Sequence, residues 1–310
     1  MAKIDYARVI TDAMIARMEA SEDPWKQPRN VKGGSMPRNA VRGNLYHGVN
    51  PFVLWHVAQL RGYKTNLWAT FKQWKSVGAS VRKGQNKANG CGGTQVVFFK
   101  FFKRKDKKTG EETSFPILKA YTVFNLDQVE NVPDKIAQEL EEFPELPEEE
   151  RIKHAEDFFC RLEAGSNVEV VENANEACYV PSLDQIRIPA FKDYHHPEGY
   201  YSTKAHEHGH STGHAHRLNR AEAFGNRFGS SAYAYEELVA EMTAAFVCAH
   251  LGIERNLQHP EYLKHWIKVL KNDKKALFTA ASAARKATIW MLQRAGDDTS
   301  AWDYHVEATS

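Results

Sequence analysis

Cysteine is scarce in this chain, and long apolar runs are absent. The four cysteines among 310 residues are Cys91, Cys160, Cys178 and Cys248, and no two of them form a CxxC pair. This number and spacing indicate neither a disulfide framework nor a thiolate zinc site, so we expect reduced and mostly packed thiols. No apolar stretch approaches the roughly 20 residues that span a bilayer, so we expect no membrane helix.

The N-terminus also lacks the features of a secretion signal. Residues 1–20 carry charges throughout, without an uninterrupted apolar core or a cleavage site, and their periodicity indicates an amphipathic helix. We therefore expect a cytoplasmic protein.

A large overall excess of either charge is missing, but the charges are unevenly distributed. The formal net charge is +2, yet residues 1–130 contain 22 Lys and Arg against 10 Asp and Glu, so this part carries +12 and the rest carries −10. A basic half joined to an acidic half is typical of a polyanion-binding module attached to a part with a different task.

The composition changes at residues 133–150, PDKIAQELEEFPELPEEE, which combine three prolines with a dense acidic run. We interpret this segment as an exposed linker between two domains with separate cores, residues 1–132 and 151–310. The pattern predicts an α+β fold, in which a small mixed α/β domain precedes a mainly helical domain with a small sheet.

Several elements are expected within these domains. A helix is predicted around PFVLWHVAQLRG, and the β-rich runs TQVVFFKFFKRK and FPILKAYTVFNLDQV, joined by KKTGEE, predict a hairpin. In the second domain RIKHAEDFFCRLEA is expected to be helical, SNVEVVE and CYVPSLDQIRIP to be strands, and almost everything after Ser202 has helical period.

Residues 205–220, AHEHGHSTGHAHRLNR, hold five histidines in eleven positions. His206 and His210 are four residues apart, so on a helix both rings lie on one face and can share one ion. Glu207 would then be placed to take a proton from a water on the ion, which is the HExxH arrangement of zinc peptidases. By helical geometry His208 should face away from this pair.

Two residues compete to be the third ligand. The pattern HExxHxxGxxH that starts at His206 would make His216 the ligand. The ExxAE segment that starts at Glu237 would instead supply this carboxylate, with Glu241 as an outer acceptor for a ligand histidine's second N–H. We favour Glu237, because buried carboxylates on an apolar helix need a cation or hydrogen-bond donors. His214 is a further candidate for the outer layer.

Other parts of the second domain are candidates for substrate contacts. The strand-like DQIRIP is where we expect an edge strand that pairs with an extended peptide. Tyr233 and Tyr235 are candidates for stabilising an oxyanion, although side-chain packing is the commoner role of a tyrosine.

Basic and aromatic residues alternate between positions 42 and 83. Aromatic faces stack on unpaired bases while Lys and Arg follow the phosphates, so this region is predicted to bind single-stranded DNA. The alternative for its tryptophans is a place in the core. The candidate DNA contacts are Arg42, Tyr46, Asn50, Trp55, Trp68, Gln73, Trp74, Lys75 and Lys83.

With these residues assembled, the chain resembles the ArdC family of plasmid antirestriction proteins, whose N-terminal region is shared with conjugation-associated primases of the TraC kind. The resemblance rests on GNLYHGVNPFVLW, NLWATFKQWKSVGASVRKG and YTVFNLDQV in the first half, and on KAHEHGHSTGH, RLNR and YAYEELVAEMTAAF in the second. It implies an N-terminal domain that binds single-stranded DNA, a C-terminal zincin-like metallopeptidase domain, and protection of incoming plasmid DNA from host restriction.

The resemblance also implies roles for single residues. His206, His210 and Glu237 would bind Zn²⁺, or another divalent ion such as Mn²⁺, and Glu207 would be the catalytic base.

Three functions follow from these features. The first is a metallopeptidase that acts at single-stranded DNA on an unknown protein, such as a restriction component. The second is a non-catalytic protein that coats the DNA and contains a structural metal. The third is a metal-dependent nuclease, which is disfavoured because the site lacks the carboxylate-rich donor set that hard cations prefer.

Overall fold

The computed structural model describes residues 5–20, 23–28, 35–84, 92–105, 112–139, 147–220, 231–253 and 263–302. In the first half the elements are α1 (Tyr6–Glu19), β1 (Arg38–Asn39), α2 (Asn50–Arg61), β2 (Leu67–Thr70), α3 (Phe71–Ser76), β3 (Ser80–Val81), β4 (Thr94–Lys105), β5 (Glu112–Asn125), β6 (Val129–Glu130) and α4 (Asp134–Glu139). In the second half they are α5 (Glu148–Ser166), β7 (Glu169–Glu172), β8 (Cys178–Val180), β9 (Gln185–Ile188), α6 (Pro197–Ser211), α8 (Ser231–Leu251), α9 (Leu263–Asn272) and α10 (Ala276–Ala295).

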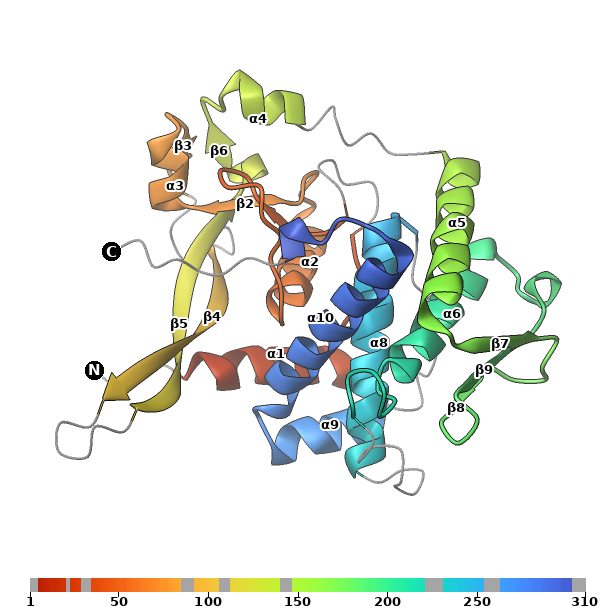
Figure 1. Ribbon diagram of the computed structural model, residues 1–310. Helices are drawn as coiled ribbons and strands as arrows, with labels where there is room; N and C mark the ends of the chain where they lie inside the picture. Colours follow the sequence, from red (N-terminus) through yellow and green to blue (C-terminus); the bar gives the residue numbers. More distant parts are fainter. Residues whose placement is uncertain are drawn as a thin grey trace.

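A four-stranded sheet in the order β1-β2-β5-β4 forms the framework of the first half. Its longest part is the antiparallel ribbon of β4 and β5, which pair from Thr94 with Val123 to Lys105 with Glu112 (Figure 1). The predicted hairpin is therefore confirmed, while its turn lies outside the described residues. Strands β3 and β6 form a separate antiparallel pair next to α3.

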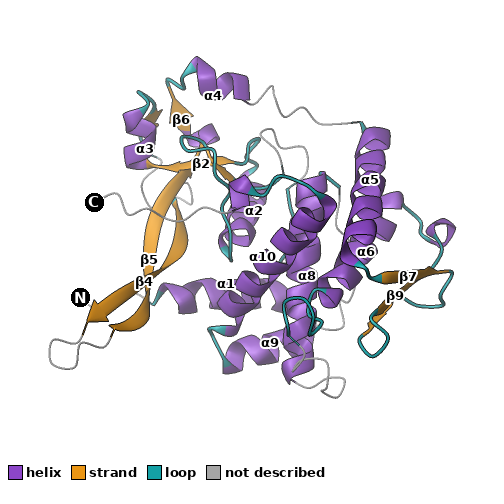
Figure 2. Cartoon of the chain, viewed as in Figure 1, coloured by secondary structure: helices purple, strands orange, loops and turns teal. Residues whose placement is uncertain are grey.

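Helix α8 runs through the second half, where it contacts α6, α9 and α10, and α5 packs on α6 and α10 (Figure 1). The three strands of the second sheet, in the order β7-β9-β8, lie beside α6 (Figure 2). The predicted α+β fold, with a mixed first part and a mainly helical second part, is confirmed.

The second sheet corrects one prediction about substrate contacts. The segment CYVPSLDQIRIP forms two strands that turn at Asp184, whose φ of +51° lies in the left-handed region that Asp tolerates. Strand β9, which contains most of DQIRIP, pairs with β7 on one side and with β8 on the other. The prediction that it is an edge strand is therefore wrong, and β8 and β7 are the outer strands of this described sheet.

The predicted linker is helical at both of its described ends. Helix α4 occupies Asp134–Glu139 and α5 begins at Glu148, while residues 140–146 lie outside the described part. None of the described helices is both long and apolar enough to cross a membrane.

The main apolar core joins the two halves of the chain. Phe52 of α2 stacks on Phe246 of α8 with 5.0 Å between ring centroids, and Trp25 lies edge-on to Phe52 at 4.9 Å. Residues from α1, α2, α5, α6, α8, α9 and α10 belong to this single cluster. The expectation of separate cores is therefore wrong for the largest cluster, although two smaller clusters in the first half surround Trp68 and Trp74.

Asp297 follows the end of α10 and links this helix to α5 and α8. Its carboxylate lies 3.0 Å from His250 Nε2 of α8 and accepts a hydrogen bond from Arg161 of α5. Burial alone would raise the pKa of Asp297, but the contacts with His250 and Arg161 hold it below its ordinary value. The ionised carboxylate therefore stabilises the folded state.

We expect Asp297→Asn to lower the free energy of unfolding at pH 7 by about 1–3 kcal/mol, because it removes a charged hydrogen-bond acceptor. Since the folded-state pKa is depressed, this stabilisation is present above the ordinary pKa of about 4 and is lost as the pH falls through the folded-state value. Thermal unfolding of the wild type and the variant between pH 7 and pH 3 should give midpoints that converge at low pH. Asp157→Asn, at an exposed position of α5, is the control; a difference that persists unchanged at pH 3 would contradict this account.

Candidate metal centre

Helices α6 and α8 cross closely at the histidine-rich motif. The motif ends α6, which begins with Pro197 in its first turn, where no N–H is needed. At Gly209 a Cβ atom would lie 3.3 Å from both the Cα of Ala240 and the Cβ of Thr243 on α8. Glycine at this position therefore allows the two helices to approach closely enough for side chains on both to reach one point.

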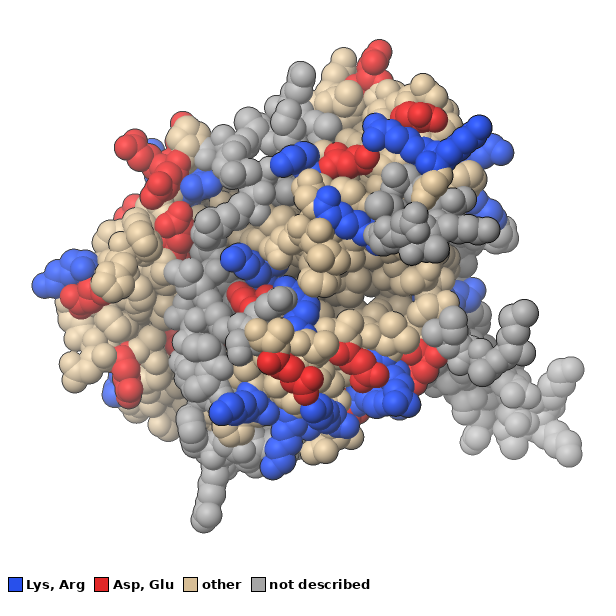
Figure 3. All heavy atoms as spheres, turned by 180° about the vertical axis from the view of Figure 1, so that it is seen from behind, with Lys and Arg blue, Asp and Glu red and all other residues tan. Residues whose placement is uncertain are grey.

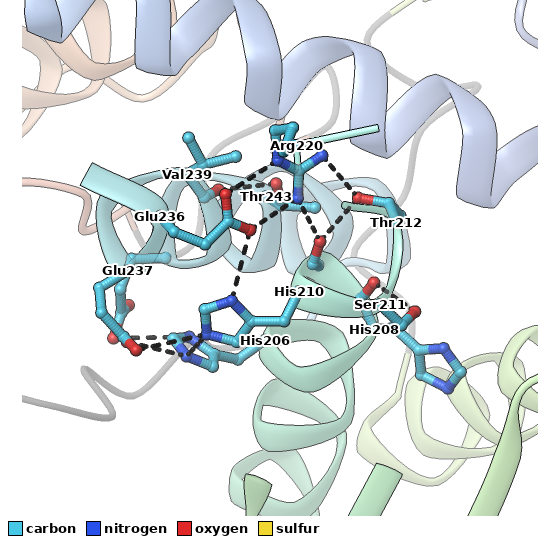
Figure 4. A network of polar contacts seen from close by, with 12 residues as sticks. His206, His208, His210, Ser211, Thr212, Arg220, Glu236, Glu237, Val239 and Thr243 are labelled. Atoms are coloured by element: carbon cyan, nitrogen blue, oxygen red, sulfur yellow. Dashed lines mark hydrogen bonds and ion pairs between the residues drawn. The ribbon is translucent and has the colours of Figure 1, made fainter. Parts of the chain in front are cut away.

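Three potential ligand atoms converge at that point, two from α6 and one from α8 (Figure 4). His206 Nε2 lies 3.1 Å from His210 Nε2 and 3.5 Å from Glu237 Oε2, and His210 Nε2 lies 3.6 Å from Glu237 Oε1. All three residues are buried, with at most 9% of the residue surface exposed. Among the described residues, no other group of histidine, cysteine and acidic side chains lies close enough together to hold a metal ion.

The spacing of these atoms fits a tetrahedral ion. Ligands about 2.0–2.1 Å from Zn²⁺ lie about 3.3 Å from one another in a tetrahedron. Here the two ring nitrogens lie 3.1 Å apart, and each lies 3.5–3.6 Å from one oxygen of Glu237, a different oxygen for each ring. One oxygen of Glu237, Oε2, is buried and makes no hydrogen bond with the described residues. Two imidazoles and a carboxylate are also a donor set that zinc accepts with a fourth position left open.

Charge in this cluster is balanced between the rings and the carboxylate. Burial would lower the pKa of His206 and His210, but the surrounding carboxylates, Glu237 foremost, together raise the pKa of both rings above the ordinary value. Conversely, burial would raise the pKa of Glu237, but the charge of His210 and the close contacts with both rings hold it well below its ordinary value. The surroundings therefore favour a negative carboxylate that faces positive charge.

Two more glutamates of α8 contact the outer nitrogens of the rings. Glu241 Oε1 lies 3.7 Å from His206 Nδ1, and Glu236 Oε1 lies 3.4 Å from His210 Nδ1. Sequence reasoning named Glu241 but missed Glu236 and its partner Arg220. Two features of the sequence could have identified them: Glu236 is an acidic residue directly before Glu237, and Arg220 is the arginine at the end of RLNR. Burial alone would raise the pKa of Glu236, but its hydrogen bonds with His210 and Arg220 hold that pKa below its ordinary value.

Glu207, next to the first histidine of the motif, is 3% exposed. Burial, together with the negative charge of Glu207, raises the pKa of the Cys178 thiol on β8 and of the Tyr194 phenol before α6. The carboxylate next to the first ring is therefore within electrostatic range of Cys178 on β8, the strand whose outer side has no partner among the described strands.

The remaining histidines of the motif lie away from the cluster. His208 points to the opposite side of α6, as predicted (Figure 4), and it is fully buried there, 3.5 Å from Glu163. His216 is exposed and its ring lies 5.1 Å from that of His214. Neither His214 nor His216 belongs to the group of converging ligand atoms. Tyr235 is half-buried and is not part of the group of converging ligand atoms, and burial raises the pKa of its phenol above the ordinary value.

Most of the predicted DNA contacts are buried. Trp55, Trp68 and Trp74 are 0% exposed, and Tyr46 is 3% exposed. A base cannot stack on a ring without an exposed face, so the prediction that these rings form a stacking platform is wrong. These rings belong to the core instead, because each lies in one of the three apolar clusters.

Two predicted polar contacts have structural roles. Asn50, which is 1% exposed, donates to the carbonyl of Val97 and accepts from its N–H, both at 2.8 Å, which attaches α2 to β4. Gln73 is half-buried and forms a capping box with Thr70 at the start of α3. Both side chains are therefore committed to the fold.

Arg42, Lys75 and Lys83 are exposed, as a DNA contact requires. Lys75 lies on α3 and Lys83 follows β3, and these two elements are in contact. The exposed side chains of Phe71, Lys72 and Arg82 belong to the same elements or border them. Seen from behind, Lys and Arg side chains gather over this end of the molecule, with acidic side chains beside them (upper right in Figure 3).

Two family models match the chain. Residues 4–124 match the N-terminal domain of the anti-restriction factor ArdC, and residues 153–283 match a zincin-like metallopeptidase. Two crystal structures of the antirestriction protein ArdC from the R388 plasmid, one metal-free and one with bound Mn(II), superimpose with TM-scores of 0.76 and 0.73. Their sequences are 34% and 32% identical to this chain in the two alignments, which cover 94% of this chain and 98% of that protein.

The chain belongs to the ArdC antirestriction family.

Two further relatives of this ArdC-family protein differ in length. The uncharacterized protein y4eC from Sinorhizobium fredii is 35% identical over 94% of this chain and 92% of its own length. The DNA primase TraC from Escherichia coli is 31% identical over 94% of this chain, but the match spans 20% of that primase.

Proposed function

We propose that this protein binds single-stranded DNA and hydrolyses a protein at a divalent metal centre, and that it thereby protects incoming conjugative DNA from host restriction. The observation that carries the proposal is the convergence of His206, His210 and Glu237 from two crossing helices. The two ring nitrogens lie 3.1 Å apart, and each lies 3.5–3.6 Å from one oxygen of the Glu237 carboxylate. Membership of the ArdC family and the match to a zincin-like metallopeptidase support it.

The surrounding charges favour a cation at this point. Glu207, Glu236, Glu237 and Glu241 are each at most 4% exposed, and among the described contacts one guanidinium, that of Arg220, pairs with them. Buried carboxylates need compensating charge. Zn²⁺ is our first choice because imidazole suits it, and Mn²⁺, which the related R388 protein binds in one crystal structure, is the alternative.

The chain's own residues would carry out the proton transfers of peptide hydrolysis. When bound, a divalent ion supplies Lewis acidity, which polarises a carbonyl oxygen and lowers the pKa of water. Glu207 would accept the proton of the attacking water and deliver it to the nitrogen of the leaving amine. The outer edge of β8, whose Cys178 is within electrostatic range of Glu207, offers backbone groups that can pair with an extended substrate.

One observation favours a second function, a DNA-coating protein with a structural metal. Glu207 is 3% exposed and His210 is 9% exposed, whereas a catalytic metal site must admit substrate. In this alternative the ion stabilises the crossing of α6 and α8, and protection comes from coverage of the DNA alone.

Glu207→Gln separates the two functions. We expect the variant to bind one zinc ion per chain like the wild type, but to lose at least about 100-fold in the cleavage of a fluorogenic peptide library, because a general base contributes about 10²–10⁴-fold. Plasmid transfer into a restricting host should lose its protection in parallel. Glu237→Gln, which removes a ligand charge, is the matched variant that should lose the zinc as well. Full protection by Glu207→Gln would instead establish the DNA-coating function.

The exposed cations near α3 provide a test of DNA binding. We expect Lys75→Gln with Lys83→Gln to weaken binding to an oligothymidine and to reduce the slope of log K against log salt by about 1.4, because each phosphate contact to a single strand contributes about 0.7. Fluorescence anisotropy at several salt concentrations measures both quantities. Lys153→Gln, on the exposed side of α5, is the control. An unchanged affinity and slope in the double variant would exclude this surface as the DNA contact.

A further inference from the structure

Adjacent glutamates on α8 contact opposite sides of one imidazole ring. Glu237 Oε1 lies 3.6 Å from His210 Nε2, while Glu236 Oε1 lies 3.4 Å from His210 Nδ1. Successive residues on a helix point about 100° apart, so the two carboxylates diverge and reach the ring from different directions. His210 is thus held between two carboxylates, of which only Glu237 belongs to the converging ligand atoms.

Arg220 fixes the position of Glu236. Its guanidinium donates to both carboxylate oxygens, with Nε 2.9 Å from Oε2 and Nη2 2.8 Å from Oε1 (Figure 4). Bidentate pairs of this kind combine strength with a defined orientation. The Arg220 side chain is 13% exposed and that of Glu236 is 3% exposed, so solvent competes little for either group.

The same guanidinium also contacts the turn of α6 that carries His210. Arg220 Nη2 donates to the carbonyl of Gly209 at 2.9 Å, and Nη1 lies 3.0 Å from Thr212 Oγ1. The carbonyl of Gly209 belongs to the last turn of α6, where carbonyl groups have no partner within the helix. Arg220 therefore links the carboxylate of α8 to the residues on both sides of His210.

We propose that Arg220 and Glu236 are positioning residues for the metal centre: Glu236 accepts the Nδ1–H of His210, and Arg220 holds Glu236 in place. This hydrogen bond would select the tautomer in which the Nε2 lone pair of His210 is free to bind the ion. The proposal rests on the proposed metal site. His206 has a looser counterpart, since its Nδ1 lies 3.7 Å from Glu241 Oε1.

The experiment compares the zinc affinity of full-length variants by competition with a chromophoric chelator. We expect Glu236→Gln to weaken zinc binding by about 10–100-fold, the usual effect of removing an outer-layer partner of a ligand histidine. Arg220→Lys keeps the charge but cannot form the bidentate pair, so it should weaken binding in the same direction by a smaller factor. Glu163→Gln is the matched control, because Glu163 makes a similar contact of 3.5 Å with His208, which faces away from the site.

A second readout reports the tautomer of His210. In the zinc-loaded wild type, ¹⁵N spectra of the histidine side chains should show His210 protonated at Nδ1, and Glu236→Gln should broaden or shift that signal. A merely structural role would lower the unfolding temperature of the metal-free protein and leave both the zinc affinity and this signal unchanged, which would overturn the proposal. Failure of the wild type to bind zinc through His206, His210 and Glu237 would instead overturn the proposed metal site, so the two failures are distinguishable.

Discussion

The close crossing of α6 and α8 is the constraint on which the candidate centre depends. Side chains from two helices can meet within 3.5–3.6 Å only if the backbones approach closely, and Gly209 makes this possible because a side chain there would meet Ala240 and Thr243 at 3.3 Å. The large apolar core holds both helices in this arrangement, and aromatic residues from the first half, such as Phe52, help to build it. The basic half of the chain is therefore part of the framework that supports the candidate centre.

Charge compensation explains why so many acidic groups can be buried at this crossing. Four glutamates within or beside the centre are each at most 4% exposed. Three of them, Glu236, Glu237 and Glu241, contact the rings of α6, and Glu236 is also paired with Arg220. A divalent ion would compensate the remaining negative charge. Helix α8 is otherwise apolar, and with this distribution of charge it can contribute acidic side chains to a polar centre without leaving their charges isolated in the interior.

Periodicity and spacing predicted what depends on local sequence. The hairpin of β4 and β5, the helical second half and the shared face of His206 and His210 all follow from regular patterns over a few turns or strand residues. The burial of Glu237 and Glu241 was also predictable, because they interrupt a helix of Ala, Val, Leu and Phe. These features need no knowledge of how distant segments pack.

The failures involve tertiary contacts that no local pattern encodes. Trp68 and Trp74 have the composition of a base-stacking surface, but the apolar clusters of the first half enclose them. The placement of β9 between two strands depends on a parallel pairing with β7, and the role of Arg220 depends on the path of the chain after α6. Composition identified the residue types in these cases, but not their neighbours.

The most direct test of the metal centre is a crystal structure of the zinc-loaded protein with anomalous diffraction measured at the zinc edge. The account predicts one strong anomalous peak within about 2.0–2.2 Å of His206 Nε2, His210 Nε2 and a carboxylate oxygen of Glu237. A peak held by His214 and His216, or the lack of any peak between α6 and α8, would contradict it.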